Sequence, residues 1–193
     1  MWASLTADKD TFITDVKAEM TRRDPRQRHT WVIVTDGERA LQQRVADSFQ
    51  DATLILDYLH VAEKLWACAH ALHREGTPHA QAFVYERAKR ILEGDVDQVV
   101  KGLRLIVTKR KLTGSKAKTL LNAAAYLKRN RQRMRYDTYL ANGWPIASGS
   151  VEGACKNLIR DRFERSGMRW TCETAEALPR LRAVYLSGDL DGY

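Results

Sequence analysis

The feature that most constrains the fold is a strand–helix–strand pattern within residues 30–57. Two apolar runs, residues 31–34 and 53–56, are rich in β-branched side chains and too short for helices. We therefore expect them to form buried strands. The stretch between them, residues 38–49, has helical spacing, with an apolar face made of Ala40, Leu41, Val45 and Phe49. A helix between two strands is a βαβ unit, which makes the strands parallel neighbours in one sheet.

Each expected strand is followed closely by an aspartate, Asp36 after the first and Asp57 after the second. Functional groups of open α/β sheets gather at the carboxyl ends of the strands, so this pair is a candidate site. An acid at such a position is also commonly the cap of the next helix. His60, one turn after Asp57, is either a metal ligand or a packing residue that hydrogen-bonds this carboxylate.

The rest of the chain has an almost entirely helical pattern. We expect helices over residues 10–23 (capped by Asp10 or Thr11), 61–72, 79–92, 96–107, 115–134, 150–166 and 172–186, with a loop over 136–149. The expected fold class is α/β but mostly helical overall. Residues 1–60 would form a partial α/β core, residues 61–149 an all-α insertion, and residues 150–193 the last helices of the core.

The chain of 193 residues carries a net charge of +8, which favours a polyanionic partner such as nucleic acid. Its three cysteines are widely spaced and predict neither a disulfide framework nor a metal site. The sequence has no signal peptide and no apolar run of membrane-spanning length. We therefore expect a cytoplasmic protein with no membrane contact.

A third acid completes a set that suits a divalent cation. Glu152 lies in the first turn of an expected helix, after a turn-rich loop. Carboxylates from three different elements, Asp36, Asp57 and Glu152, are suitable ligands for Mg²⁺ (or Mn²⁺), which prefers oxygen. Paired metal ions let an enzyme activate a water or a 3′-hydroxyl and stabilise the leaving oxygen of a phosphodiester.

Basic residues follow Glu152 along its helix and predict a DNA-binding surface. The basic residues on this helix are Lys156, Arg160, Arg162 and Arg165, and Arg169 with Trp170 comes just after it. Arginine grips phosphates, and a tryptophan can stack on a base. The alternative is a solvated charged face with Trp170 in the core. A second basic cluster, Arg129 to Arg135, ends the long helix and is a weaker candidate for DNA contact.

Three motifs in this order resemble the C-terminal half of a bacterial insertion-sequence transposase of the ISKra-four family, related to the L3 and Mutator-like groups. They are T-D-G-E-R-A-L (residues 35–41), L-D-Y-L-H-V-A-E-K-L-W (56–66) and S-G-S-V-E-G-A-C-K-N-L-I-R-D-R-F-E-R-S-G-M-R-W (148–170). The last block is the most specific. The resemblance covers the chain from about residue 31 to its end.

The resemblance implies an RNase H-like catalytic core with a D, D, E triad, two divalent metal ions, and DNA at insertion-sequence ends as partner. It also implies a helical insertion between the second acid and the glutamate. By this resemblance Asp36 is the second aspartate, Glu152 is the glutamate, and Asp57 with His60 resembles a C/D-x-x-H motif. The alternative assignment makes Asp57 the second aspartate.

The chain departs from this family before Asp36, where the family's first aspartate lies on a strand. The earlier acids, Asp8, Asp10, Asp15 and Asp24, lie in or beside a helix. We therefore expect a fragment from a truncated or frame-split gene, with weak or absent catalysis as a free chain. An exposed edge of a shortened sheet favours association with a second copy or a full-length transposase. Two other hypotheses are a non-catalytic DNA-binding or regulatory fragment, and a helical interaction protein whose acids are caps.

Overall fold

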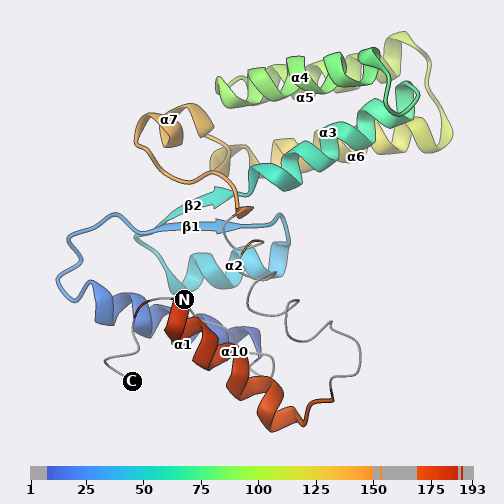
Figure 1. Ribbon diagram of the computed structural model, residues 1–193. Helices are drawn as coiled ribbons and strands as arrows, with labels where there is room; N and C mark the ends of the chain where they lie inside the picture. Colours follow the sequence, from blue (N-terminus) through green and yellow to red (C-terminus); the bar gives the residue numbers. More distant parts are fainter. Residues whose placement is uncertain (1–7, 150–152, 154–168, 187, 189–193) are drawn as a thin grey trace. The chain divides into compact units, whose positions relative to one another are not determined.

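The computed structural model describes residues 8–149, 153, 169–186 and 188. The chain divides into two units, one made of residues 31–42 and 51–148 and the other of residues 1–30, 43–50 and 149–193. The described residues are mostly helical, as the sequence predicts, with one two-stranded parallel sheet (Figure 1). No helix within these ranges has both the length and the apolar character needed to cross a membrane.

The two expected strands are present and pair in parallel. Strand β1 (Val32–Thr35) and strand β2 (Thr53–Leu56) pair from Val32 opposite Thr53 to Thr35 opposite Leu56. Helix α2 (Arg39–Ser48) connects them. The βαβ prediction is therefore confirmed, and the carboxyl ends of both strands lie at the same edge of the sheet.

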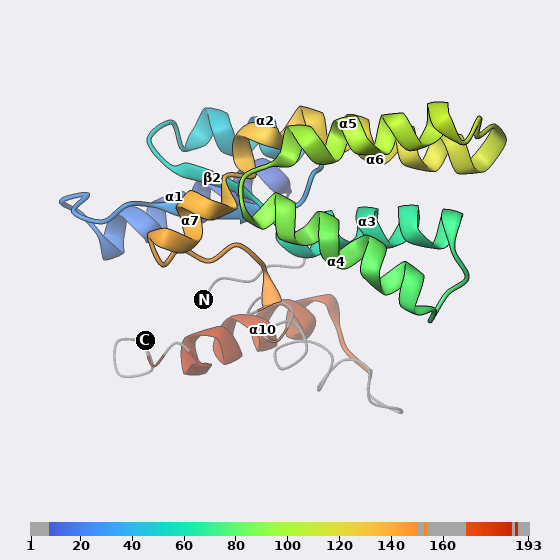
Figure 2. The same cartoon turned by 90° about the horizontal axis from the view of Figure 1, so that it is seen from above.

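A four-helix bundle follows the second strand. It consists of α3 (Tyr58–Leu72), α4 (Pro78–Leu92), α5 (Val96–Lys109) and α6 (Gly114–Asn130). Helix α3 packs against α4 and α6, and α5 packs against the same two helices, which closes the bundle (Figures 1 and 2). The links are short because Thr77 caps α4 with Pro78 in its first turn, and Gly94 adopts a φ of +89° before α5.

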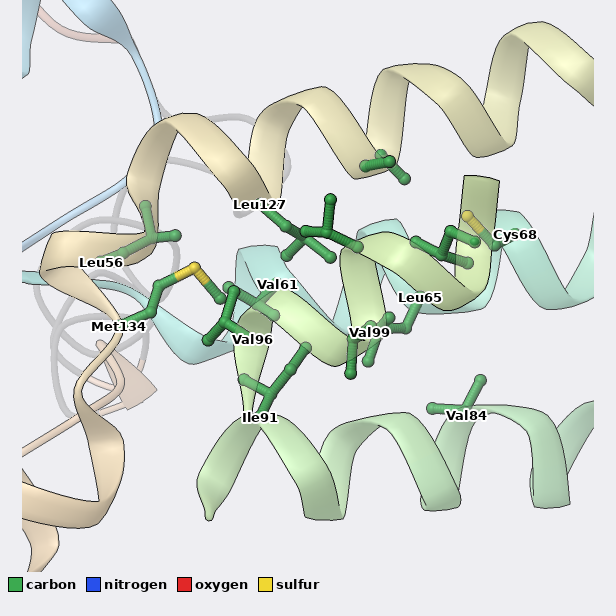
Figure 3. Close-up of a cluster of buried hydrophobic side chains, with 14 of the residues drawn as sticks. Leu56, Val61, Leu65, Cys68, Val84, Ile91, Val96, Val99, Leu127 and Met134 are labelled. Carbon is green, nitrogen blue, oxygen red and sulfur yellow. The ribbon is translucent and has the colours of Figure 1, made fainter. Parts of the chain in front are cut away.

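One apolar core joins the sheet to the bundle (Figure 3). Helix α3 supplies four buried residues at helical spacing, Val61, Leu65, Cys68 and Ala69. The core continues through Ile55, Leu56, Phe83, Val84, Ile91, Val96, Val99, Leu103, Leu120, Leu127 and Met134. The spacing of Trp66 from Val61 and Ala69 predicts an inward side chain, but Trp66 is 37% exposed and packs against His70, with ring centroids 5.4 Å apart.

The starts of α1 and α3 are set by caps that lie earlier in the chain than expected. Helix α1 (Lys9–Arg23) is capped by Asp8, whose Oδ1 accepts from the backbone N–H groups of Asp10 and Thr11 at 2.9 Å. Helix α3 begins at Tyr58, three residues earlier than expected, because the Asp57 carboxylate accepts from the Leu59 N–H at 2.9 Å. In both cases an aspartate outside the apolar pattern sets the boundary.

The expected loop over residues 136–149 begins with a helix instead. Helix α6 ends at Asn130, a 3₁₀ turn η1 (Arg131–Arg133) follows, and α7 spans Tyr136–Ala141. The side chain of Tyr136 is fully buried, and its hydroxyl donates to the Leu56 carbonyl at 2.7 Å. Burial of two tyrosines, Tyr136 and Tyr139, outweighs the turn-rich composition of this stretch.

The other unit contains α1, the end of α2 and α10 (Cys172–Leu186). Its buried apolar residues include Ile13, Val45, Phe49 and Ala183. Lys17 lies over the Phe49 ring at 6.0 Å, and Arg44 pairs with Asp10. Thr171, directly before the expected start of the last helix, caps α10 by accepting from the Thr174 N–H at 3.2 Å. The helix predicted over residues 150–166 lies almost entirely outside the described residues.

Replacing Tyr136 by phenylalanine is expected to lower the free energy of unfolding by about 1–2 kcal/mol, because the Leu56 carbonyl loses a buried donor. Urea denaturation followed by circular dichroism measures the change. Tyr85→Phe is the matched control, since Tyr85 is 71% exposed, and it is expected to change stability by less than about 0.5 kcal/mol. Equal stabilities of the two variants would contradict the structural role of the Tyr136 hydroxyl.

Candidate functional site

The structure places Asp36 and Asp57 next to each other at the carboxyl edge of the sheet. Each acid directly follows the last residue of its strand, and these last residues, Thr35 and Leu56, are paired in register. The Asp57 backbone N–H donates to the Thr35 carbonyl at 2.8 Å, which extends the ladder to the acids. Two aspartates from different parts of the sequence therefore lie on neighbouring strands at the same edge of the sheet.

Both carboxylate oxygens of Asp57 already hold the chain in place. The residue is only 2% exposed. Its Oδ1 accepts from the Leu59 N–H, and its Oδ2 accepts from the Ser148 hydroxyl. The first bond caps α3, and the second fixes the segment after α7 against the start of that helix. Asp57 therefore acts as the N-terminal cap of α3, which is a common structural role of aspartate.

Asp36 is the more accessible of the two acids. Its Oδ1 accepts from the Glu38 N–H at 3.0 Å, and its backbone carbonyl accepts from Gln42 Nε2 at 3.0 Å. Its Oδ2 has no hydrogen-bond partner in the part of the chain that the structure describes. The Asp36 side chain is therefore fixed by one oxygen and offers the other as a ligand.

Tyr126 lies against Gly37, directly beside Asp36. A Cβ atom on Gly37 would overlap the Tyr126 ring, so only glycine fits here without displacing that ring. Lys64 and Arg129 lie over the ring at 5.5 and 5.4 Å, and Arg129 also donates to the Gly37 carbonyl at 3.3 Å. Burial, assisted by the negative charge of Asp36, raises the pKa of Tyr126 to about 12. The phenol therefore stays protonated at neutral pH and can donate a hydrogen bond.

Sequence reasoning missed this part of the site. The helical spacing of Leu120, Ala124 and Leu127 predicts that Tyr126 belongs to the apolar face of the long helix, and Lys64 lies in the 56–66 motif without a role of its own there. The only local indication of this contact was Gly37, because a glycine next to an acid permits close approach of another group. The approach depends on α6 packing against α3, which no short stretch of sequence specifies.

His60 lies against Glu63, one turn further along α3. Its Nδ1 is 3.2 Å from Glu63 Oε2, and the side chain is partly exposed. The Asp57 oxygens accept instead from Leu59 and Ser148, so the expected hydrogen bond between His60 and Asp57 is not formed.

Most of the other predicted site residues lie outside the described part of the chain, namely Glu152, Lys156, Arg160, Arg162 and Arg165. Arg169 is exposed and Trp170 is half-buried. Within residues 8–149, 153, 169–186 and 188, no group of three or more His, Cys, Asp or Glu residues has a geometry that would hold a metal ion. Asp36 and Asp57 supply suitable oxygen atoms, but a third ligand would have to come from elsewhere.

The basic cluster at the end of α6 is divided among different contacts. Arg133 donates to Gln42 Oε1 at 2.9 Å, and Arg131 lies 3.8 Å from Asp97. Arg135 reaches the Thr138 hydroxyl at 3.5 Å. Only Arg129 lies beside the acids, through its contact with Gly37. The four arginines therefore do not act as one surface.

Comparison of the chain with protein-family models, curated proteins and solved structures finds no significant match to any of them.

Proposed function

We propose that this chain acts on DNA as an RNase H-like transposase core, which cleaves and joins strands at the ends of an insertion sequence. The observation that carries the proposal is the adjacency of Asp36 and Asp57 at the ends of two parallel strands. The order of the three motifs that resemble such transposases supports it, as does the net charge of +8.

In this proposal Asp36, Asp57 and Glu152 would hold Mg²⁺ or Mn²⁺. The two described acids fit part of such a site: both are oxygen donors, and Asp36 has one oxygen to offer. A divalent ion bound there supplies the positive charge that activates a nucleophilic oxygen and stabilises a leaving one. The protonated hydroxyl of Tyr126 and the cations of Lys64 and Arg129 then orient a phosphate beside the acids.

A second function, a DNA-binding or regulatory transposase remnant without catalysis, is favoured by one specific observation. Both oxygens of Asp57 are engaged by Leu59 and Ser148, so this acid serves the fold whether or not a metal binds. A remnant of this kind keeps the fold and the positive charge but needs no metal ligands.

Metal titration and DNA nicking together distinguish the two functions. For the transposase, Asp36→Asn and Glu152→Gln are each expected to weaken Mg²⁺ or Mn²⁺ binding by about 10–100-fold in calorimetry and to abolish nicking of supercoiled plasmid. The control is Glu75→Gln, an exposed acid between α3 and α4. Metal binding and nicking that do not differ among all four proteins would refute the catalytic function and support the remnant.

A further inference from the structure

Two neighbouring hollows lie along α6 and are lined by basic side chains. One, of about 510 Å³, is lined by Arg39, Lys64, Ala67, Thr119, Asn122, Ala123, Ala125, Tyr126 and Arg129. The other, of about 470 Å³, is lined by Arg104, Ala125, Lys128, Arg129, Arg131 and Gln132. They share Ala125 and Arg129, so they form one surface feature, which we name the α6 groove.

The α6 groove is positively charged, and most of that charge is not neutralised by the protein. Neither lining contains an acid. Arg39, Lys64, Arg104 and Lys128 make no ion pair with any acid in the part of the chain that the structure describes. Of the other two basic side chains in the lining, Arg131 lies 3.8 Å from Asp97, and Arg129 donates to the Gly37 carbonyl. Unpaired cations around one hollow attract an anion.

These cations come from four different elements of the chain. Arg39 begins α2, Lys64 lies on α3, Arg104 on α5 and Lys128 on α6. A solvated charged face of one helix would not bring them together. The closed packing of the bundle does so, because α6 lies against both α3 and α5 (Figure 2).

The size and chemistry of the groove fit a polymer better than a small anion. Small-molecule sites are mainly enclosed and apolar with a few polar groups, whereas six of the thirteen residues that line this groove are lysine or arginine. The lining residues run along the chain from Thr119 to Gln132, about 20 Å at ~1.5 Å per helical residue. That length corresponds to about six nucleotides of one strand at ~3.4 Å each.

Three alanines form the small-residue part of the lining. Ala67 comes from α3, and Ala123 and Ala125 come from α6. Short side chains between long cations leave room for a backbone to lie close to the helices, while the cations reach its phosphates. Tyr126 and Arg129 connect the groove to Gly37 and hence to Asp36.

We propose that the α6 groove binds the sugar-phosphate backbone of a DNA strand, with Arg39, Lys64, Arg104 and Lys128 as its phosphate contacts. The proposal deepens the proposed function and rests on it for the choice of DNA as partner. It adds the helical bundle as a second surface that contacts the DNA backbone, besides the basic residues that follow Glu152. A strand in this groove would run past Tyr126 toward the acid pair.

The test measures binding of a fluorescently labelled 12-nucleotide single strand, and of the matching duplex, by anisotropy over a range of salt concentrations in EDTA. The variant Arg104→Gln/Lys128→Gln removes two contacts far from Asp36 in sequence. We expect it to bind about tenfold more weakly near 0.1 M salt and to lower the slope of log affinity against log salt by about 1.4 for the single strand. Lys64→Gln is expected to lower the slope by about half as much.

The matched control is Lys109→Gln/Lys111→Gln, which removes the same charge from exposed positions at the end of α5, outside the groove. It is expected to keep most of the wild-type affinity. Equal weakening by the control, or an unchanged salt slope in the groove variant, would overturn the proposal. Binding of inorganic phosphate or a mononucleotide as tightly as the 12-mer would also overturn it, because the groove would then be a small-anion site. Circular dichroism confirms that each variant is folded.

The same assay separates this proposal from the proposed function. Asp36→Asn in EDTA is expected to bind DNA at least as tightly as wild type, because it removes a negative charge and no phosphate contact. Loss of metal-dependent nicking with intact groove binding would therefore locate the defect in catalysis. If Arg104→Gln/Lys128→Gln nicks DNA as wild type does and binds it with unchanged affinity, the groove proposal is refuted, whereas the proposed function is not.

Discussion

Replacing Leu103 by alanine is expected to lower the free energy of unfolding by about 2–5 kcal/mol, the range for deleting a fully buried leucine side chain. Leu103 lies on α5, has no exposed surface, and belongs to the core that joins the sheet to the bundle. Because α5 packs against both α4 and α6, a cavity here weakens two helix contacts at once. Urea denaturation and amide hydrogen exchange of the α5 segment measure the loss in the unit that contains this helix.

Leu105→Ala is the matched control for this prediction. Leu105 lies two residues further along the same helix but is 51% exposed. Both substitutions change helix propensity equally, so the difference between them reports burial alone. We expect Leu105→Ala to change stability by less than about 0.5 kcal/mol. Similar losses for the two variants would mean that α5 does not face the core as the structure has it.

The helix–strand order was predictable because its signals are local. Both strands lie within one residue of their expected positions, since short β-branched runs bounded by polar residues leave few alternatives. The links around α4 are similarly close because Pro78 and Gly94 mark them, whereas α3 begins three residues earlier and α6 ends four residues earlier than expected. The adjacency of Asp36 and Asp57 then follows from the parallel pairing that a βαβ unit requires.

The errors that concern the site come from contacts between residues far apart in sequence. Tyr136 hydrogen-bonds Leu56 across 80 positions and stabilises a helix where the composition predicts a loop. Ser148 reaches Asp57 across 91 positions. Tyr126 comes to Gly37 only because α6 packs against α3. These contacts depend on how the bundle closes, so neither periodicity nor turn signals could predict them.

Replacing Asp57 by alanine is expected to lower the free energy of unfolding by about 2–4 kcal/mol. Loss of the cap at the start of α3 accounts for about 1 kcal/mol of this. The Ser148 hydroxyl, left without its acceptor in a partly buried position, accounts for about 1–3 kcal/mol more. Urea denaturation measures the total. Ser148→Ala alone and in combination with Asp57→Ala measures the coupling between the two side chains, which should be well above zero.

Two further substitutions separate this structural role from metal binding. Asn is as good a helix cap as Asp: its Oδ1 can accept from the Leu59 N–H while its Nδ2 donates to the Ser148 hydroxyl oxygen, so Asp57→Asn should retain most of the stability that Asp57→Ala loses. Asp36→Ala removes a single hydrogen bond from Glu38 and should cost about 1 kcal/mol or less. If Asp57→Asn is stable but no longer binds metal, Asp57 has both roles. If it is stable and binds metal as wild type does, Asp57 is a cap alone, and Asp36 remains the ligand that the sheet offers. A loss of stability in Asp57→Asn equal to that in Asp57→Ala would contradict the capping role, because the charge rather than the hydrogen bonds would then hold α3 in place.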